Sequence, residues 1–296
     1  KHDNHYITNI AFSPNGKTCM IHTATDETGG YIYLYKDTFI KSDWGRASPD
    51  MEVEMESSAT VHTAITDDSV YYTTTNDYLD EDDDDGEEYT VMAYNYKTKI
   101  TRPIWTSENE IELMAAVRAR GVDFIATFDD EYHLHLHKNP SLGQPEEILK
   151  LNTELSTRLR ALDITLSMGV VYMMIVYAEN DKDFITVVTE KNKLVFKEEM
   201  KGGPGDLLRI HAVIKKDHLV FKDVENGHDI ISVRNFITGA SYTICPGHNV
   251  TNLVFDGDTI GQATKGKIVL WDLPKDRDKL KDIMNALKSK NREVLK

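Results

Sequence analysis

The sequence predicts an all-β protein built from repeated units of about four short strands. Three observations carry this prediction. Runs of four to eight residues alternate apolar with polar side chains, are rich in β-branched and aromatic residues, and are bounded by Asn, Asp and Gly. The runs recur with a period of about 40 to 53 residues. No helical period separates them before residue 275, which excludes a sheet whose strands alternate with helices.

The strands of each unit are assigned in order along the chain. First strands are expected to begin near Ile7, Thr60, Glu112, Arg160, Ile210 and Val250. Second strands are expected at residues 70–74, 124–128, 170–177 and 218–221, third strands at 90–94, 132–137, 184–188 and 230–233, and fourth strands at 100–105, 147–151, 194–196 and 242–244. A β-propeller is the economical arrangement, because radial closure removes the exposed edges of six separate sheets.

One unit carries a recognisable motif. Gly247-His248 precedes a strand-like run at 250–255, an Asp-Gly-Asp turn follows, and the run 268–272 ends in Trp271-Asp272. This unit resembles a WD40 repeat, the blade of a β-propeller, and residues 7–35 are a weaker copy. The resemblance implies a single propeller over residues 1–273 that acts as a scaffold, in adaptors or substrate-recognition subunits such as ubiquitin-ligase receptors.

The match departs from the WD40 pattern in two respects. Lys265 stands where a well-formed repeat has Asp, and Leu273-Pro274 ends the last unit before an outer strand. We therefore expect a divergent propeller of six blades, or seven if an N-terminal piece precedes Lys1. The lack of an initiator Met favours such a preceding region, which in a ligase receptor would be the docking domain.

A short helix is predicted at residues 274–296. Leu280, Ile283, Met284 and Leu287 recur at helical spacing, and Pro274 stands just before the first turn. We expect this helix to pack on the propeller or on a further domain, with a partner-binding helix as the alternative.

Composition limits the functional class. The net charge of −15 argues against general nucleic-acid binding, because the field repels phosphate. No apolar run approaches the roughly 18 residues that span a bilayer, so no membrane insertion is expected. Two distant cysteines, Cys19 and Cys245, predict buried reduced thiols in a cytoplasmic or nuclear protein.

Two motifs resemble known sites and fail on closer inspection. Residues 261–267 resemble a phosphate-binding loop, but Ile268 replaces the Mg²⁺-binding hydroxyl and a strand follows instead of a helix. The second motif is an acidic run at residues 80–88, which resembles a calcium-binding loop. It has no bidentate Glu at the position that an EF-hand requires, and predicted strands flank it. We expect a solvated loop, with capture of basic protein segments or loose binding of divalent ions as the alternatives. Its residues are Asp80, Glu81, Asp82, Asp83, Asp84, Asp85, Glu87 and Glu88.

Three histidines alternate along one predicted strand, at His133, His135 and His137. The first and third lie about 13 Å apart by strand rise, too far to share one ion. Two of them with a carboxylate from a neighbouring strand remain conceivable as a zinc site. The favoured interpretation is a polar, partly exposed strand face opposite Tyr132, Leu134 and Leu136 in the core, so no metal or cofactor is assigned.

The preferred function is a non-catalytic protein-interaction module that binds other proteins in a larger complex. The alternatives are a scaffold subunit of a trafficking, ribosome-assembly or chromatin complex that uses the acidic loop, and a propeller hydrolase with carboxylates at its channel mouth. No nucleophile elbow and no Cys-x-x-Cys pair occurs. Because exposed Arg and Trp are enriched at interface hot spots, the candidate partner contacts are Trp44, Arg46, Arg158, Arg160 and Arg209.

Overall fold

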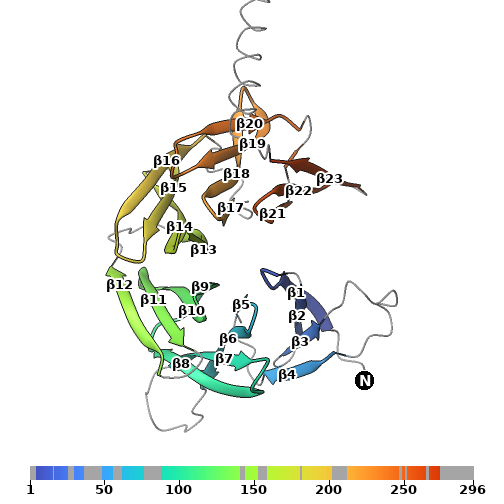
Figure 1. Ribbon diagram of the computed structural model, residues 1–296, viewed down its shortest axis with the longest axis vertical. Coiled ribbons are helices and arrows are strands. Elements are labelled where there is room, and N and C mark those ends of the chain that lie inside the picture. Colours follow the sequence, from blue (N-terminus) through green and yellow to red (C-terminus); the bar gives the residue numbers. More distant parts are fainter. Residues whose placement is uncertain are drawn as a thin grey trace, which may run out of the picture. The chain divides into compact units, whose positions relative to one another are not determined.

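The computed structural model describes residues 5–15, 17–25, 30–36, 49–55, 62–76, 88–140, 144–152, 159–180, 182–201, 212–246, 249–250, 252–264 and 267–273. All of the regular secondary structure in these ranges is β-strand (Figure 1). The chain divides into two compact units, Lys1–Pro204 and Gly205–Lys296, which are described separately below.

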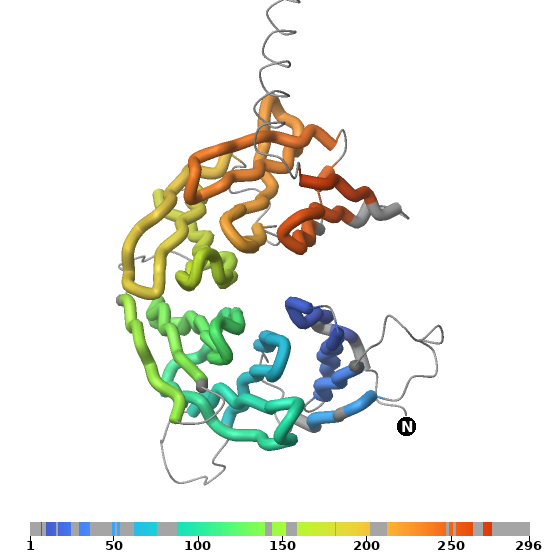
Figure 2. The backbone as a smooth tube through the Cα atoms, viewed as in Figure 1, coloured from blue at the N-terminus to red at the C-terminus, as the bar shows by residue number. Residues whose placement is uncertain are grey.

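Unit 1 contains four antiparallel sheets, each made of four strands that are consecutive in the chain. Figure 2 follows the chain through them in sequence order, from blue to yellow. The sheets are β1 (His5–Phe12), β2 (Thr18–Thr25), β3 (Gly30–Lys36) and β4 (Met51–Met55); β5 (Thr63–Ile65), β6 (Ser69–Asn76), β7 (Glu88–Asn95) and β8 (Ile100–Ser107); β9 (Ile111–Ala119), β10 (Val122–Asp129), β11 (His133–Pro140) and β12 (Glu146–Asn152); and β13 (Leu159–Ser167), β14 (Val170–Glu179), β15 (Lys182–Thr189) and β16 (Leu194–Met200).

Unit 2 contains two sheets of the same kind. The first is four-stranded and the second has three strands within the described residues. Their strands are β17 (Ala212–Lys215), β18 (His218–Glu225), β19 (His228–Asn235) and β20 (Ser241–Ile244), followed by β21 (Asn252–Phe255), β22 (Thr259–Thr264) and β23 (Lys267–Asp272).

The core of each unit lies between consecutive sheets. In unit 1 the first strands β1, β5, β9 and β13 are neighbours in that order. Apolar side chains from facing sheets fill the spaces between them, as where Tyr71 and Val91 of one sheet meet Ile111 and Ile125 of the next. Successive side chains point to opposite sides of a sheet, so one strand can contribute to the interfaces on both sides, and β10 and β14 are buried along most of their length.

The all-β prediction is confirmed at the level of a six-bladed β-propeller fold: five of the six expected groups are four-stranded, and the last has three strands within the described residues. The described first strands begin within three residues of the positions that the period predicted. Trp271 and Asp272 end β23, the third strand of its sheet, as the WD40 resemblance implied. A seventh blade stays a prediction. The helix expected at 274–296, the Gly247-His248 start and Lys265 lie outside the described residues.

Three local expectations need correction. Cys19 is buried as predicted, but Cys245, which follows the last residue of β20, is exposed. Tyr132 is 37% exposed and adopts a left-handed backbone conformation in the turn before β11, so it does not belong to the core beside Leu134 and Leu136. The opposite face of β11 is not solvated either, because Trp105 of the preceding sheet β5–β8 lies over it, and His135 and His137 are each only 2% exposed.

Candidate functional site

Of the five residues expected to contact a partner, the described part of the chain contains Arg160. Trp44, Arg46, Arg158 and Arg209 lie outside the described residues, as do Asp80, Glu81, Asp82, Asp83, Asp84, Asp85 and Glu87 of the acidic loop. Glu88 begins β7 and is exposed. Arg160 lies on β13, where its side chain is 11% exposed and pairs with Asp183 of β15 at 3.3 Å. Its role toward a partner stays a prediction.

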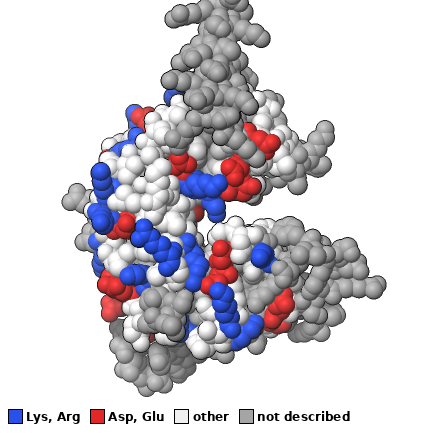
Figure 3. All heavy atoms as spheres, in the orientation of Figure 1, with Lys and Arg blue, Asp and Glu red and all other residues white. Residues whose placement is uncertain are grey.

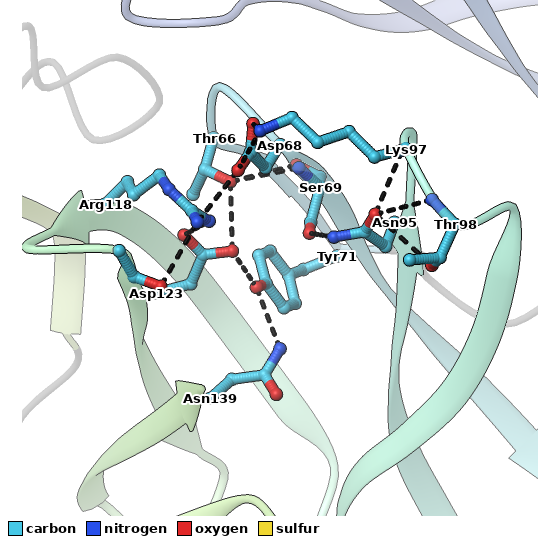
Figure 4. Close-up of polar contacts among 11 residues, drawn as sticks. Thr66, Asp68, Ser69, Tyr71, Asn95, Lys97, Thr98, Arg118, Asp123 and Asn139 are labelled. Carbon is cyan, nitrogen blue, oxygen red and sulfur yellow. Dashed lines mark hydrogen bonds and ion pairs between the residues drawn. The ribbon is translucent and has the colours of Figure 1, made fainter. Parts of the chain in front are cut away.

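The densest polar cluster described lies between the sheet β5–β8 and the sheet β9–β12 (Figure 4). At its centre is the carboxylate of Asp123, which is 2% exposed near the start of β10. The Tyr71 hydroxyl donates to Asp123 Oδ2 at 2.5 Å, and Thr66 Oγ1 donates to the same oxygen at 3.2 Å. Asn139 of β11 donates to the Tyr71 oxygen at 3.0 Å. The two sheets are therefore joined by a continuous hydrogen-bond chain within the core.

Arg118 of β9 links this buried cluster to the surface. One of its nitrogens lies 2.9 Å from Asp123 Oδ1, and the other lies 2.8 Å from Asp68 Oδ2 in the β5–β6 turn. Asp68 also pairs with Lys97 at 2.9 Å. The Lys97 side chain is 74% exposed while that of Arg118 is only 19% exposed. The forked guanidinium can hold two carboxylates at once, which a single ammonium cannot do with the same geometry.

Burial governs the ionisation of this cluster. It raises the pKa of the Asp123 carboxyl, although the hydrogen bonds from Tyr71 and Thr66 and the charge of Arg118 act in the opposite direction. Burial also raises the pKa of the Tyr71 hydroxyl, and the negative charge of Asp123 adds to this effect. Tyr71 therefore stays protonated and serves as a permanent donor. The cluster is built for fixed hydrogen bonding between blades.

Turns between first and second strands touch their neighbours along unit 1. The backbone nitrogen of Asn15, in the β1–β2 turn, donates to Asp67 of the β5–β6 turn at 2.9 Å. Farther along, the Arg120 side chain of the β9–β10 turn lies directly over Gly169 of the β13–β14 turn. Met168 beside it is 76% exposed. We call one surface the turn rim: it consists of the turns at residues 13–15, 66–69, 119–122 and 167–170, together with Lys97, which pairs with Asp68.

A second cluster lies on the outer half of the sheet β9–β12. Two overlapping groups have ligand atoms that all lie within 4.8 Å of one another: Asp129 with His133 and His135, and His135 with His137 and Glu147. The three histidines therefore do not share one site, as the strand spacing predicted. The described residues instead realise the combination of two histidines and a carboxylate from the neighbouring strand.

A β-bulge brings Glu147 into this group. Leu136 of β11 pairs with Leu149 of β12, but His137 pairs with Glu147, so Ile148 is left unpaired. Without the bulge, Ile148 would stand opposite His137, because each residue of a regular antiparallel pair faces one partner. The extra residue re-aims the carboxylate onto the histidine face, a common use of bulges. The side chains of His135 and Glu147 then meet at 2.6 Å.

Ionisation also differs within this second cluster. Burial alone would raise the pKa of Asp129, but hydrogen bonds from His135, the His133 backbone and Asn109 lower it to about 2. Burial lowers the pKa of His137 to about 4, with the nearby His135 contributing and Glu147 opposing. At neutral pH, Asp129 is therefore a carboxylate and His137 a neutral imidazole.

Unit 2 holds an open hollow of about 530 Å³ beside the β18–β19 turn, with Glu225, His228, Asp229 and Cys245 in its lining. Asp229 accepts a hydrogen bond from the Val250 backbone at 2.8 Å and pairs with Lys222 at 3.0 Å. Its carboxylate is thus occupied in holding the chain entering β21.

Sequence reasoning found the histidines but missed Asp123, Tyr71 and Arg118. Their only signal is a polar or hydroxyl-bearing residue within an apolar run, as at Asp123 in the run 122–128. That signal shows that a polar group is buried and needs partners. It does not show which partners, because Tyr71 lies 52 residues earlier in the chain.

Comparison with known proteins identifies the fold and no family. No protein-family model matches the chain, and no curated protein matches it. In the described residues no helix is both long and apolar enough to cross a bilayer.

Solved structures match across more than nine-tenths of the chain. A prolyl endopeptidase structure aligns with 92% of the chain at 12% identity and a TM-score of 0.53. An oligogalacturonate lyase in complex with manganese aligns with 91% at 10% identity and a TM-score of 0.53, covering 78% of that chain. Oligopeptidase B from Leishmania major aligns with 91% at 9% identity and a TM-score of 0.50. The present chain spans only 43% of the first protein and 39% of the third. At these identities the likeness shows the propeller fold alone.

Proposed function

We propose that this chain is a divergent WD40-like propeller that serves as a non-catalytic protein-interaction module, and that the turn rim of unit 1 is its contact surface. The observation that carries the proposal is that the rim is fixed to the buried polar cluster. Arg118 binds Asp68 of the rim and the buried Asp123 together, at 2.8 and 2.9 Å. Rigid elements that carry exposed side chains lower the entropic cost of association.

The rim exposes side chains suited to a protein partner. Lys97 stands beside Asp68, Arg120 reaches the neighbouring turn, and Met168 is 76% exposed. Met and Arg are enriched at the cores of protein interfaces. Basic and acidic side chains are interspersed on the face of unit 1 seen in Figure 3, which suits a partner of mixed charge better than a polyanion.

A propeller hydrolase is less favoured by the described residues. Acid–base catalysis often uses a carboxyl group whose pKa is raised. Among the described residues, burial raises the pKa of the Asp123 and Asp183 carboxyls. They are only 2% and 7% exposed, and each pairs with an arginine, so neither faces a substrate. The sequence-based alternative that the acidic loop binds basic segments stays a prediction.

Partner capture by the whole protein tests the proposal. The rim variant combines Lys97→Glu, Arg120→Glu and Met168→Asp. The control applies the same chemical changes elsewhere on unit 1, as Lys150→Glu, Lys191→Glu and Leu194→Asp, all at exposed positions. Quantitative affinity purification should lose the specific partners with the rim variant only. Equal recovery by both variants would locate the contact surface elsewhere, and turnover of a substrate would contradict the module.

A further inference from the structure

The group formed by His135, His137 and Glu147 has the composition and spacing of a metal site. Each residue offers one ligand atom, and these atoms lie within 4.8 Å of one another. Tetrahedral Zn²⁺ with bonds of about 2.0–2.1 Å places its ligand atoms roughly 3.3 Å apart. The His135 and Glu147 atoms, now at 2.6 Å, would therefore separate by less than about 1 Å around an ion.

His137 supplies an independent sign that a ligand is missing. Its Nε2 atom is buried and has no hydrogen-bond partner among the described residues, and the residue is only 2% exposed. Leaving a buried polar atom unpaired is costly, and native structures rarely do so without a reason. A bound cation would use the lone pair of a neutral imidazole directly.

Asp129 prepares His135 as a ligand. Its Oδ2 lies 3.3 Å from Nε2 of His135, on the side of the ring away from Glu147. If Nε2 carries the proton and donates it to Asp129, then Nδ1 presents its lone pair toward Glu147. Metal-binding histidines usually donate their second nitrogen to a carboxylate in this way.

The surroundings give the site a closed side and an open side. Trp105, from β8 of the neighbouring sheet, lies over both rings, with its centroid 4.4 Å from that of His135 and 4.8 Å from that of His137. On the other side, the Glu147 side chain is 38% exposed. An ion could enter past Glu147 and keep one coordination position toward solvent.

We propose that His135, His137 and Glu147 bind one Zn²⁺ ion, with the fourth position open. Two imidazoles and one carboxylate suit Zn²⁺ better than Ca²⁺ or Mg²⁺, which prefer oxygen ligands alone. The overlapping group of Asp129, His133 and His135 is the weaker site. Its carboxylate already accepts hydrogen bonds from His133 at 2.7 and 3.2 Å and from Asn109 at 3.3 Å.

Metal titration of the chelator-treated protein tests this site. The probes are Co²⁺, whose visible absorption reports tetrahedral coordination, and Zn²⁺ in competition with it. Fluorescence of Trp105, one of three tryptophans, gives a second readout. The wild type should bind one Co²⁺ with tetrahedral absorption, and Zn²⁺ should displace it. His137→Gln and Glu147→Gln should each weaken binding at least tenfold, and Asp129→Asn about 10- to 100-fold.

His133→Gln is the matched control, because His133 lies on the same strand face but outside the proposed trio. It should keep the affinity within about threefold. Loose binding of metal ions by the acidic residues 77–88 would be the same in every variant. The difference in affinity between the wild type and each variant therefore reports the proposed site alone. Thermal unfolding in chelator shows whether each variant folds, and Glu147→Gln changes a side chain at the surface. The proposal is overturned if the wild type binds no better than His137→Gln, or if His133→Gln weakens binding as much as His137→Gln does.

Discussion

The Tyr71 hydroxyl, on one blade, donates a 2.5 Å hydrogen bond to the Asp123 carboxylate on the next. Both residues are essentially inaccessible, at 0% and 2% exposure, so water cannot replace either partner. Hydrogen bonds to charged groups contribute about 1.5–3 kcal/mol, and losing one partner leaves the other unsatisfied. This contact is therefore a main polar link between the sheet β5–β8 and the sheet β9–β12.

Tyr71→Phe should lower the free energy of unfolding by about 1.5–3 kcal/mol. A double-mutant cycle with Asp123→Asn, measured by chemical denaturation, should give a coupling energy of about 1–3 kcal/mol. Tyr242→Phe is the control, because the Tyr242 hydroxyl is buried with no hydrogen-bond partner among the described residues. Its removal should be neutral or slightly stabilising. A cycle with no coupling would mean that the short contact contributes nothing to stability.

The blades could be predicted because their signal is local. Runs of β-branched and aromatic residues such as Phe124–Phe128, bounded by turn residues such as Gly121 and Asp129-Asp130, are local features that the sequence displays directly. Contacts between blades depend on tertiary structure instead. Asp123 reads as one polar residue in an apolar run, and only the fold places Tyr71 and Arg118 around it.

The histidine cluster shows the same limit. The spacing of His133, His135 and His137 predicted that two could act together, and burial of the face reverses the expectation of a solvated strand. The decisive element is the bulge at Ile148. Because of it, Glu147 instead of Ile148 lies opposite His137. No local propensity marks that bulge, because it arises from how β12 meets the rest of the sheet.

Arg118 should not tolerate replacement by another cation. Arg118→Lys should destabilise by about 1–2 kcal/mol, since one ammonium cannot reproduce the forked contact with Asp68 and Asp123. Arg118→Met should cost about 3–5 kcal/mol by leaving a buried carboxylate unpaired. The comparison is Lys97→Met, which removes an exposed partner of the same Asp68 and should cost less than about 1 kcal/mol. The free energies of unfolding are measured by urea denaturation. Similar losses of stability for Arg118→Met and Lys97→Met would refute the bridging role of Arg118.

Acid should destabilise unit 1 through His62. Burial, with a smaller contribution from the neighbouring His22, lowers the pKa of this imidazole to about 4. Between pH 4 and the ordinary value near 6.5, the unfolded chain binds the proton that the folded chain refuses. The stabilisation is therefore complete above about pH 6.5 and is lost as the pH falls toward 4, by no more than roughly 3 kcal/mol. His62→Gln should flatten this part of the stability–pH curve, and an unchanged slope would show that His62 titrates normally.

Gly30 should be the least replaceable of the described glycines. It begins β3, and a Cβ there would collide with the backbone carbonyl oxygen of Thr23 on the paired strand β2. The backbone cannot yield without breaking the register of that pair, so Gly30→Ala should cost about 3 kcal/mol or more, toward the upper end of overpacking effects. Gly121→Ala is the control. It introduces a Cβ at a left-handed position where nothing lies within 4 Å, so only the conformational penalty of about 1 kcal/mol applies. The comparison uses the denaturation midpoints of the two variants, provided that both have the same dependence of unfolding free energy on denaturant concentration. A larger loss for Gly30→Ala than for Gly121→Ala then measures the steric collision. Equal losses would mean that β2 and β3 can shift apart, and that the first blade is held less firmly than its pairing implies.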